Sequence, residues 1–135
     1  YDWLRENSNK NVYYIDGNTK VDNRDFFKRK MEEEDDTVLV ASTGTFSEGI
    51  DLPNIHNLFI TESHKSEIII RQMLGRPMRL REGKDQVIVV DFSDNFFYNG
   101  VNHFQRKNYL MRHAAEREKT YKEKKFPFKK FKVKL

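Results

Sequence analysis

Thr37-Val-Leu-Val-Ala41 decides the fold of this chain, together with the loop Ser42-Thr-Gly-Thr-Phe-Ser-Glu-Gly-Ile-Asp-Leu-Pro53 that follows it. The first run is apolar after its threonine, which is typical of a strand that is covered on both faces of a sheet. The loop holds small hydroxyl residues and glycines, which expose backbone N–H groups at the carboxyl end of the strand. In parallel α/β sheets, binding sites form at the carboxyl ends of strands, so this junction is a candidate site.

The rest of the chain continues an alternation of apolar strands and helical patterns. Strands are predicted where a short apolar run is bounded by turn residues: 12–15, 37–41, 57–61 and 86–91. Helices are predicted where apolar residues follow helical spacing: the end of a helix at 2–10, then 23–34, a short turn near 46–49, 67–74 and 102–125. The predicted N-caps are Asp22, with Asp25 as its capping-box partner, and Ser66. This alternation implies a parallel sheet with right-handed crossovers.

The length and composition of the chain limit its class. Its 135 residues suffice for one domain with a core, and the absence of cysteine excludes disulfides and thiolate metal sites. Cysteine-free composition also fits an intracellular protein. No apolar run approaches the roughly 20 residues of a membrane span, and no signal peptide is recognisable. Because the chain starts at Tyr1 rather than Met, we expect a fragment or a processed piece.

Charge is divided unevenly along the chain. Residues 1–100 hold 13 Lys and Arg against 18 Asp and Glu, whereas residues 101–135 hold 12 against 3. Such a basic end predicts a polyanionic partner, and a solubilising tail is the alternative. Its candidates for phosphate contacts are six lysines: Lys122, Lys124, Lys125, Lys129, Lys130 and Lys132.

Phenylalanines alternate with lysines after the helix predicted over 102–125, which Pro127 ends. This period of two predicts a terminal edge strand. We expect Phe126, Phe128 and Phe131 to pack against the body of the domain, with base stacking as the alternative.

A second motif, Gln72-Met-Leu-Gly-Arg-Pro-Met-Arg79, places one amide and two guanidinium groups around a Gly-Arg-Pro turn. Arginine presents a rigid fork of donors that matches phosphate oxygens. Arg76 and Arg79 are spaced so that both can face one anion from the end of a helix. An isolated pair of this kind is more often a solvated helix face, so the motif gains its weight from the loop upstream.

That upstream loop ends in Gly49-Ile50-Asp51, which presents a carboxylate just beyond a glycine. In other nucleotide-binding folds a carboxylate accepts a hydrogen bond from a ribose hydroxyl. A loop in which a serine or threonine merely caps a helix is the alternative. The two motifs occur in order, each at a strand–helix junction, and together they are much more specific than either alone.

The pair of motifs resembles motifs V and VI of superfamily 2 helicases and translocases. Ser42–Pro53 is similar to motif V, and Gln72–Arg79 to the Q-x-x-G-R-x-x-R form of motif VI. Gly17 and Arg24 resemble the G-x6-R element that precedes them in this superfamily. The sequence of the motif V run looks most like that of the UvsW-type recombination helicases of T4-like phages. The resemblance covers most of residues 10–95.

The resemblance implies the second lobe of a two-lobed motor, a three-layer α/β domain with a parallel, RecA-like (P-loop NTPase-like) sheet. Residues 1–100 would form this lobe, truncated at the N-terminus. Residues 101–135 would add a basic helix and an edge strand packed on the same domain. In such motors the first lobe binds ATP through a P-loop and an acidic Mg²⁺ box, and the second lobe closes over it.

The resemblance also implies a role for each matched residue. Arg76 and Arg79 would be arginine fingers facing the γ-phosphate, and Gln72 would bridge the lobe interface near the nucleotide. Gly49 and Asp51 would lie at the ribose. The remaining matched positions would contact the phosphates of the nucleic-acid strand: Ser42, Thr43 and Gly44.

One departure from the family pattern concerns the nucleotide itself. The sequence contains no G-x-x-x-x-G-K-[ST] run and no Asp-Glu box after a strand. ATP and Mg²⁺ would therefore be held mainly by the first lobe, and we expect no metal ligands in this chain, whose histidines are not spaced as a set. The chain alone is predicted neither to hydrolyse ATP nor to unwind nucleic acid.

The leading hypothesis is the C-terminal lobe of an ATP-dependent DNA helicase that remodels branched DNA in recombination or repair. Its partners would be branched or single-stranded DNA and the first lobe, and it would not bind a membrane. It would act inside the cell, in the host cytoplasm if it is phage-encoded. Alternatives are the same lobe of an RNA helicase or restriction-enzyme motor, since such lobes contact backbone rather than bases. Two further alternatives are an ATPase-inactive RecA-like binding module and a small α/β domain with a solubilising tail.

Overall fold

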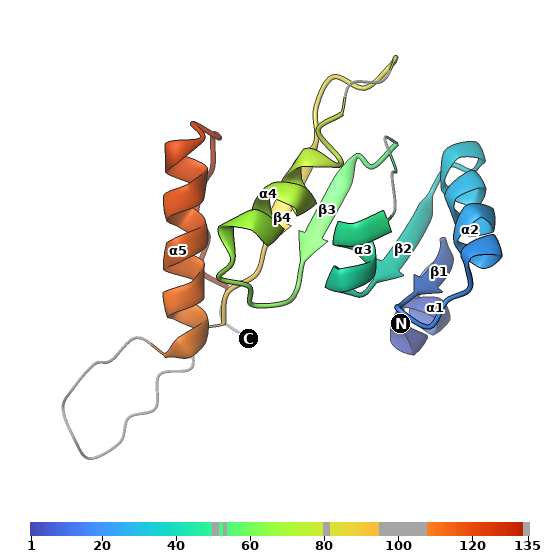
Figure 1. Cartoon of the computed structure of the whole chain (residues 1–135), viewed down its shortest axis with the longest axis horizontal. Helices are drawn as coiled ribbons and strands as arrows, with labels where there is room; N and C mark the ends of the chain where they lie inside the picture. Colours follow the sequence, from blue (N-terminus) through green and yellow to red (C-terminus); the bar gives the residue numbers. More distant parts are fainter. Residues whose placement is uncertain (50–51, 53, 80–81, 95–107, 134–135) are drawn as a thin grey trace. The chain divides into compact units, whose positions relative to one another are not determined.

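The computed structural model describes residues 1–49, 52, 54–79, 82–94 and 108–133 of the chain. Helices and strands alternate along these residues (Figure 1). In chain order they are α1 (Asp2–Asn7), β1 (Asn11–Ile15), α2 (Val21–Glu33), β2 (Thr37–Ala41), α3 (Thr43–Gly49), β3 (Asn57–Ile60), α4 (Glu67–Gly75), β4 (Ile88–Asp91) and α5 (Tyr109–Glu123). All four apolar runs predicted as strands are strands, so the predicted α/β alternation is confirmed.

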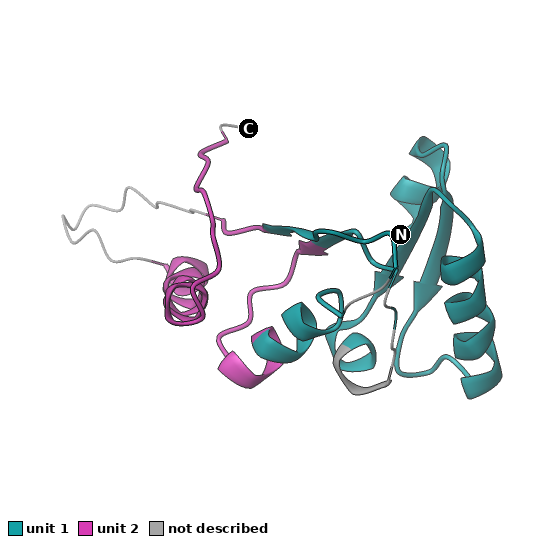
Figure 2. Ribbon diagram, turned by 90° about the horizontal axis from the view of Figure 1, so that it is seen from above, with its two compact units in different colours: residues 1–58, 71–90 teal, residues 59–70, 91–135 magenta. Residues whose placement is uncertain are grey.

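The chain forms two compact units (Figure 2). The first comprises residues 1–58 and 71–90, and the second comprises residues 59–70 and 91–135. The chain crosses between them inside regular elements, within β3, α4 and β4.

In the first unit, β1 and β2 pair in parallel, with the register running from Asn11 opposite Thr37 to Ile15 opposite Ala41. Ile15 is fully buried and forms the centre of a core with Leu52. Half-buried apolar side chains from the neighbouring elements pack against this pair: Phe27, Met31, Leu39, Ala41 and Ile55. The residues of β2 are half-buried rather than fully covered.

β3 and β4 form a second two-stranded sheet. The backbone N–H of Ile88 donates to the carbonyl of His56 at 2.9 Å, and that of Phe92 donates to the carbonyl of Ile60 at 3.1 Å. Both partners advance together along the chain between these bonds, so the two strands run parallel, as expected from their apolar composition.

The start of α2 differs from the prediction. The helix begins at Val21, and its N-cap residue, Lys20, makes no side-chain cap hydrogen bond. The predicted cap, Asp22, lies in the first turn instead, where a carboxylate interacts favourably with the helix dipole. The sequence predicts Asp22 as the cap because an aspartate before a helical pattern usually has that role.

Arg24 holds the turn that precedes α2. Its Nε donates to the carbonyl of Thr19 at 2.9 Å, and its Nη2 donates to the carbonyls of Asp16 and Gly17 at 3.4 and 3.3 Å. One side chain therefore donates to three main-chain acceptors of this turn. This gives a structural reason for the spacing of Gly17 and Arg24.

A buried arginine fixes α5 in the second unit. Arg117 is 1% exposed, and its Nε and Nη2 donate to the two carboxylate oxygens of Asp91 at 2.8 and 2.9 Å. Its guanidinium also donates to the carbonyls of His64 and Phe92 at 3.0 and 3.1 Å. The phenol of Tyr121 donates to the same carboxylate at 2.8 Å. Burial and the Asp91 charge raise the pKa of Tyr121.

The N-terminus of α5 is capped by Asn108, whose side-chain oxygen accepts from the N–H of Met111 at 2.8 Å. The helix was predicted over 102–125, and the part of that range before residue 108 lies outside the described residues. Within the second unit His113 is 6% exposed and its Nδ1 lies 2.9 Å from the carbonyl oxygen of Ser63.

The predicted terminal edge strand is wrong for the described residues 126–133, which form neither helix nor strand. Phe131 and Val133 are 83% and 80% exposed, so the expected packing of Phe131 against the body is also wrong. Phe128 contacts the ring of Tyr121, with the ring centroids 6.1 Å apart. The alternation of phenylalanine and lysine suits a strand only where a neighbouring strand supplies hydrogen bonds, and the described residues supply none here.

Candidate functional site

Helix α4 positions the second motif. Its buried face carries Ile70, Met73 and Leu74, while Gln72 and Gly75 on the opposite side are exposed. Because apolar and polar residues separate in this way at helical spacing, burial of the apolar face fixes the direction in which Gln72 extends.

A tight turn follows α4 and carries the two arginines. The N–H of Arg76 donates to the carbonyl of Gln72 at 3.3 Å, and the N–H of Arg79 donates to the carbonyl of Arg76 at 3.3 Å. Pro77 between them is buried, and its carbonyl accepts from the ammonium of Lys84. Proline fixes its own backbone angle, so the turn gives both arginines a defined starting direction.

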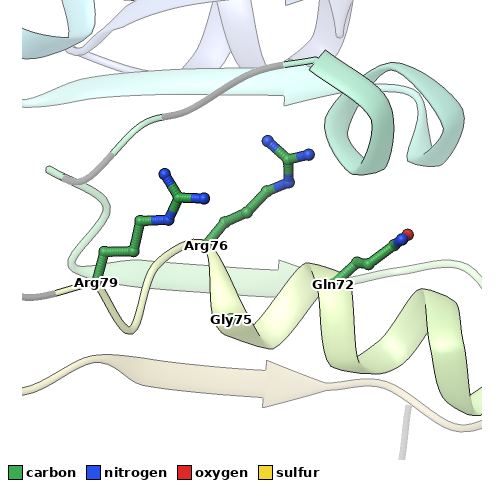
Figure 3. Close-up of a pocket in the computed structure, with 4 residues that line it drawn as sticks. All are labelled: Gln72, Gly75, Arg76 and Arg79. Atoms are coloured by element: carbon green, nitrogen blue, oxygen red, sulfur yellow. The ribbon is translucent and has the colours of Figure 1, made fainter.

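Gln72, Gly75, Arg76 and Arg79 line one hollow of ≈ 270 Å³. The three side chains leave α4 and its turn on the same side (Figure 3). The structure thus brings together the three residues that the sequence predicts to act as a unit. Guanidinium groups donate hydrogen bonds and accept none, so the hollow suits the oxygens of an anion and does not suit a metal cation.

Gly75 leaves open space beside the hollow, and its backbone conformation does not require glycine. Its φ is not positive, and a Cβ added to it would meet no atom within 4 Å. No local conformation of the chain therefore requires glycine at this position. An added side chain would extend into the hollow, which the sequence did not indicate.

The first motif begins with a helix cap. The N–H of Ser42 donates to the carbonyl of Ile15 at 3.1 Å, which extends the β1–β2 pairing by one bond. Its Oγ donates to the hydroxyl of Thr45 at 2.9 Å and accepts from the N–H of Thr45 at 3.4 Å. Thr43 and Gly44 form the first turn of α3. Ser42 thus caps α3, which is the alternative that its sequence position left open.

The two motifs meet at Phe46. Its side chain is only 7% exposed, and the Cζ atom of Arg76 lies 5.9 Å from the centroid of its ring. Figure 3 shows the side chain of Arg76 extending from the end of α4 toward α3. Sequence reasoning assigned no role to Phe46, although an aromatic residue in a loop of small residues was a visible clue.

The predicted ribose-facing residues are only partly described. Gly49 is the last residue of α3, whereas Asp51 lies outside the described residues.

Two of the six candidate lysines at the basic end are held by one carboxylate in the second unit. Lys122 donates to Glu118 at 2.7 Å, and Lys130 binds the other oxygen of that group. These two ammonium groups lower the pKa of Glu118 to about 2. The four other candidate lysines are exposed: Lys124, Lys125, Lys129 and Lys132.

Within the described residues, no group of three or more His, Cys, Asp or Glu side chains is placed to hold a metal ion. Across the same part of the chain, no helix combines the length and the apolar character needed to cross a membrane.

Parallel strands alternating with helices, with an amide and two guanidinium groups beside one hollow, define the class of RecA-like motor lobes. The chain belongs to the helicase conserved C-terminal domain family, whose model matches residues 1–81. The resemblance of its motifs to the second lobe of superfamily 2 helicases is thereby confirmed.

Two similar proteins are themselves described as helicases. The chain is 31% identical over 130 residues to the ATP-dependent DNA helicase uvsW of Enterobacteria phage T4, covering 93% of this chain and 26% of that protein. It is 35% identical over 82 residues to the putative ATP-dependent helicase IRC3 of Saccharomyces cerevisiae, covering 61% of this chain and 12% of that protein. The chain therefore spans about a quarter or less of the length of these relatives.

Solved structures agree with this assignment. The crystal structure of T4 UvsW matches with a TM-score of 0.64 and 29% identity, over 90% of this chain and 26% of that chain. The C-terminal part of the Fun30 ATPase domain matches with a TM-score of 0.59, over 90% of this chain and 43% of that chain. At 18% identity, the second match shows the fold alone.

Proposed function

We propose that this chain is the second motor lobe of an ATP-dependent DNA helicase or translocase that remodels branched DNA in recombination or repair. The observation that carries the proposal is the hollow in which Gln72, Arg76 and Arg79 come together in a chain of the helicase C-terminal family. The description of a similar phage protein as an ATP-dependent DNA helicase supports DNA as the substrate.

In this proposal the first lobe holds ATP, and the second lobe completes the active site when it closes. Arg76 and Arg79 donate to oxygens of the γ-phosphate and stabilise the charge that develops during transfer to water. Arginine fingers of this kind increase kcat by about 10³–10⁵ in related NTPases. Gln72 donates from its amide beside them, at the interface between the lobes. Gly49 and Asp51 lie near the ribose.

Mg²⁺ would neutralise the phosphate charge in such a reaction. The side chains of the hollow do not fit it, because two guanidinium groups repel a cation and the amide oxygen of Gln72 alone is too few ligands. We therefore assign Mg²⁺ to the first lobe, and this chain alone is expected to show no ATPase activity.

Two parts of the chain would each contact nucleic-acid phosphates. Ser42, Thr43 and Gly44 lie at the start of α3 in the first unit, and the lysines of the basic end in the second unit would neutralise phosphates. In this scheme residues 1–100 are the lobe and residues 101–135 are its basic extension. The protein would act inside the cell, where ATP and nucleic acid are found.

The experiment is DNA-stimulated ATP hydrolysis by the whole motor protein that contains this lobe. Arg76→Ala is expected to lower kcat by about 10³ or more without unfolding the protein. Arg71→Ala is the matched control, because Arg71 is an exposed arginine of the same helix that does not line the hollow. Wild-type turnover by the Arg76→Ala protein would remove the basis of the proposal.

A further inference from the structure

The contact between Phe46 and Arg76 joins a buried ring to the side chain proposed as an arginine finger. The ring is 7% exposed, and the Cζ atom of Arg76 lies 5.9 Å from its centroid. The face of an aromatic ring is electron-rich and attracts a guanidinium at this distance. The attraction is stronger where water is excluded, as it is around a buried ring.

The backbone that carries the ring is connected to the sheet by hydrogen bonds. The N–H of Phe46 donates to the carbonyl of Ser42 at 2.9 Å, and the N–H of Ser42 donates to the carbonyl of Ile15 at 3.1 Å. These two backbone hydrogen bonds therefore link the residue that carries the ring to the end of β1. Ile15 is itself fully buried, so this link starts at the core of the first unit.

The backbone of Arg76 fixes the base of the other side of the contact. The backbone of Arg76 is tied to α4 by its bond to Gln72, and the buried Pro77 follows it. Beyond the backbone, an arginine side chain has several rotatable bonds and samples many directions unless something restrains it. A transition state rewards donors that are already in place, because reorienting them during the reaction costs free energy.

We propose that Phe46 is a positioning residue for Arg76: its ring restrains the guanidinium in the direction required for finger activity. This inference rests on the proposed function of Arg76. Phe46 does not touch the nucleotide in this scheme and acts only through the arginine. A ring that merely fills space in the core would instead be replaceable by any side chain of similar volume.

The test replaces Phe46 in the whole motor protein with phenylalanine analogues that carry one, two and three ring fluorines. Fluorine withdraws electron density from the face of the ring while leaving its shape almost unchanged, so folding is preserved. We expect kcat for ATP hydrolysis to fall step by step with fluorine number, by about tenfold in total, while KM for ATP changes less than about twofold. A kcat that is flat across the series overturns the inference.

Two conventional variants complete the design. Phe46→Leu removes the ring and is expected to lower kcat about tenfold, and Phe46→Tyr restores most of the activity because it keeps an aromatic face. Equal kcat for the folded Leu and Tyr variants contradicts a positioning role, and if either fails to fold the fluorine series decides. Arg76→Ala, measured in parallel, separates the two proposals: if it retains activity the finger assignment fails, whereas loss of activity with a flat fluorine series removes only the role of Phe46.

Discussion

Arg117 satisfies several acceptors of the second unit at once, and it is almost fully buried. Its main partner, Asp91, has a side chain that is only 18% exposed. Arg117→Met would leave this carboxylate without a counter-charge in a place that is mostly shielded from water. We expect a loss of about 3–5 kcal/mol in the free energy of unfolding, measured by urea denaturation.

Arg112→Met is the matched control for this variant. Arg112 is exposed on the same helix, and its guanidinium lies over the ring of Tyr109 with 5.9 Å to the centroid. Its loss is expected to cost less than about 1 kcal/mol. Similar losses for the two variants would mean that the buried ion pair does not stabilise the unit.

Gly83 is required by the local backbone conformation, whereas Gly75 leaves space in the hollow. Gly83 has a φ of 78°, where a side chain is strained, and Gly83→Ala is expected to cost about 1–2 kcal/mol in thermal unfolding.

Gly75→Ala meets no atom within 4 Å and is expected to change stability by less than about 0.5 kcal/mol. In the whole motor, however, Gly75→Ala should lower ATPase activity, because its methyl group enters the space proposed for phosphate. Full activity of that variant would argue that nothing binds close to this part of the hollow.

At the scale of elements, Glu118 connects α5 to the segment that follows it. Lys122 from the helix and Lys130 from the tail both bind its carboxylate, so the pKa in the folded chain is about 2, below the usual 4.5. The folded chain then binds this proton less readily than the unfolded chain does. The stabilising contribution is therefore complete above pH 4.5 and is lost as the pH falls toward 2.

Glu118→Gln tests this linkage through urea unfolding at a series of pH values. The difference in stability between wild type and variant should be largest near neutral pH and should vanish near pH 2. Glu123→Gln is the control, because its partner Lys119 lies 3.9 Å away and both side chains are largely exposed. A wild-type advantage that does not depend on pH would show that the two lysines do not set the pKa of Glu118.

The sequence predicted the elements well where hydrophobic pattern alone determines them. The run at 37–41 and the helix at 67–74 lie within one residue of the observed bounds. The start of α2 was missed because the turn before it is held by the side chain of Arg24, from inside the helix, rather than by a side-chain cap. The terminal strand was missed because a period of two shows only that a strand is suitable, whereas its formation needs a neighbour.

The candidate site was predictable in its residues and not in its contacts. Gln72, Arg76 and Arg79 are close in sequence, in α4 and in the turn that follows it, so their convergence on one hollow follows from this short segment. The contact of Arg76 with Phe46 joins the turn after α4 to α3, and only the packing of the first unit creates it. No pattern in either motif contains that information.

On the scale of the whole molecule, the separation of charge has a measurable consequence. The exposed lysines of the basic end are expected to release counterions when they bind phosphates, at about 0.7 per contact for a single strand. Lys124→Ala combined with Lys125→Ala should therefore reduce the slope of log affinity against log salt by about 1.4 for single-stranded DNA. Fluorescence anisotropy with labelled oligonucleotides at several salt concentrations measures it.

A control variant removes the same charge from the acidic part of the chain. Lys10 and Lys20 are exposed in the first unit, and replacing both by alanine should leave the salt slope nearly unchanged. If both double variants reduce the slope equally, net charge rather than a binding surface governs the affinity.

The hydrogen bonds of Arg24 and Arg117 also affect which arginines a chemical reagent can modify. Dicarbonyl reagents attack solvent-exposed guanidinium groups, and Arg117 is 1% exposed with its donors engaged by Asp91 and two carbonyls. Arg24 is similarly occupied by three carbonyls of the turn before α2. Covalent labelling should therefore spare these two structural arginines and modify more accessible ones such as Arg79. Protection of Arg79 by nucleotide in the assembled motor would then serve as a footprint of its occupancy.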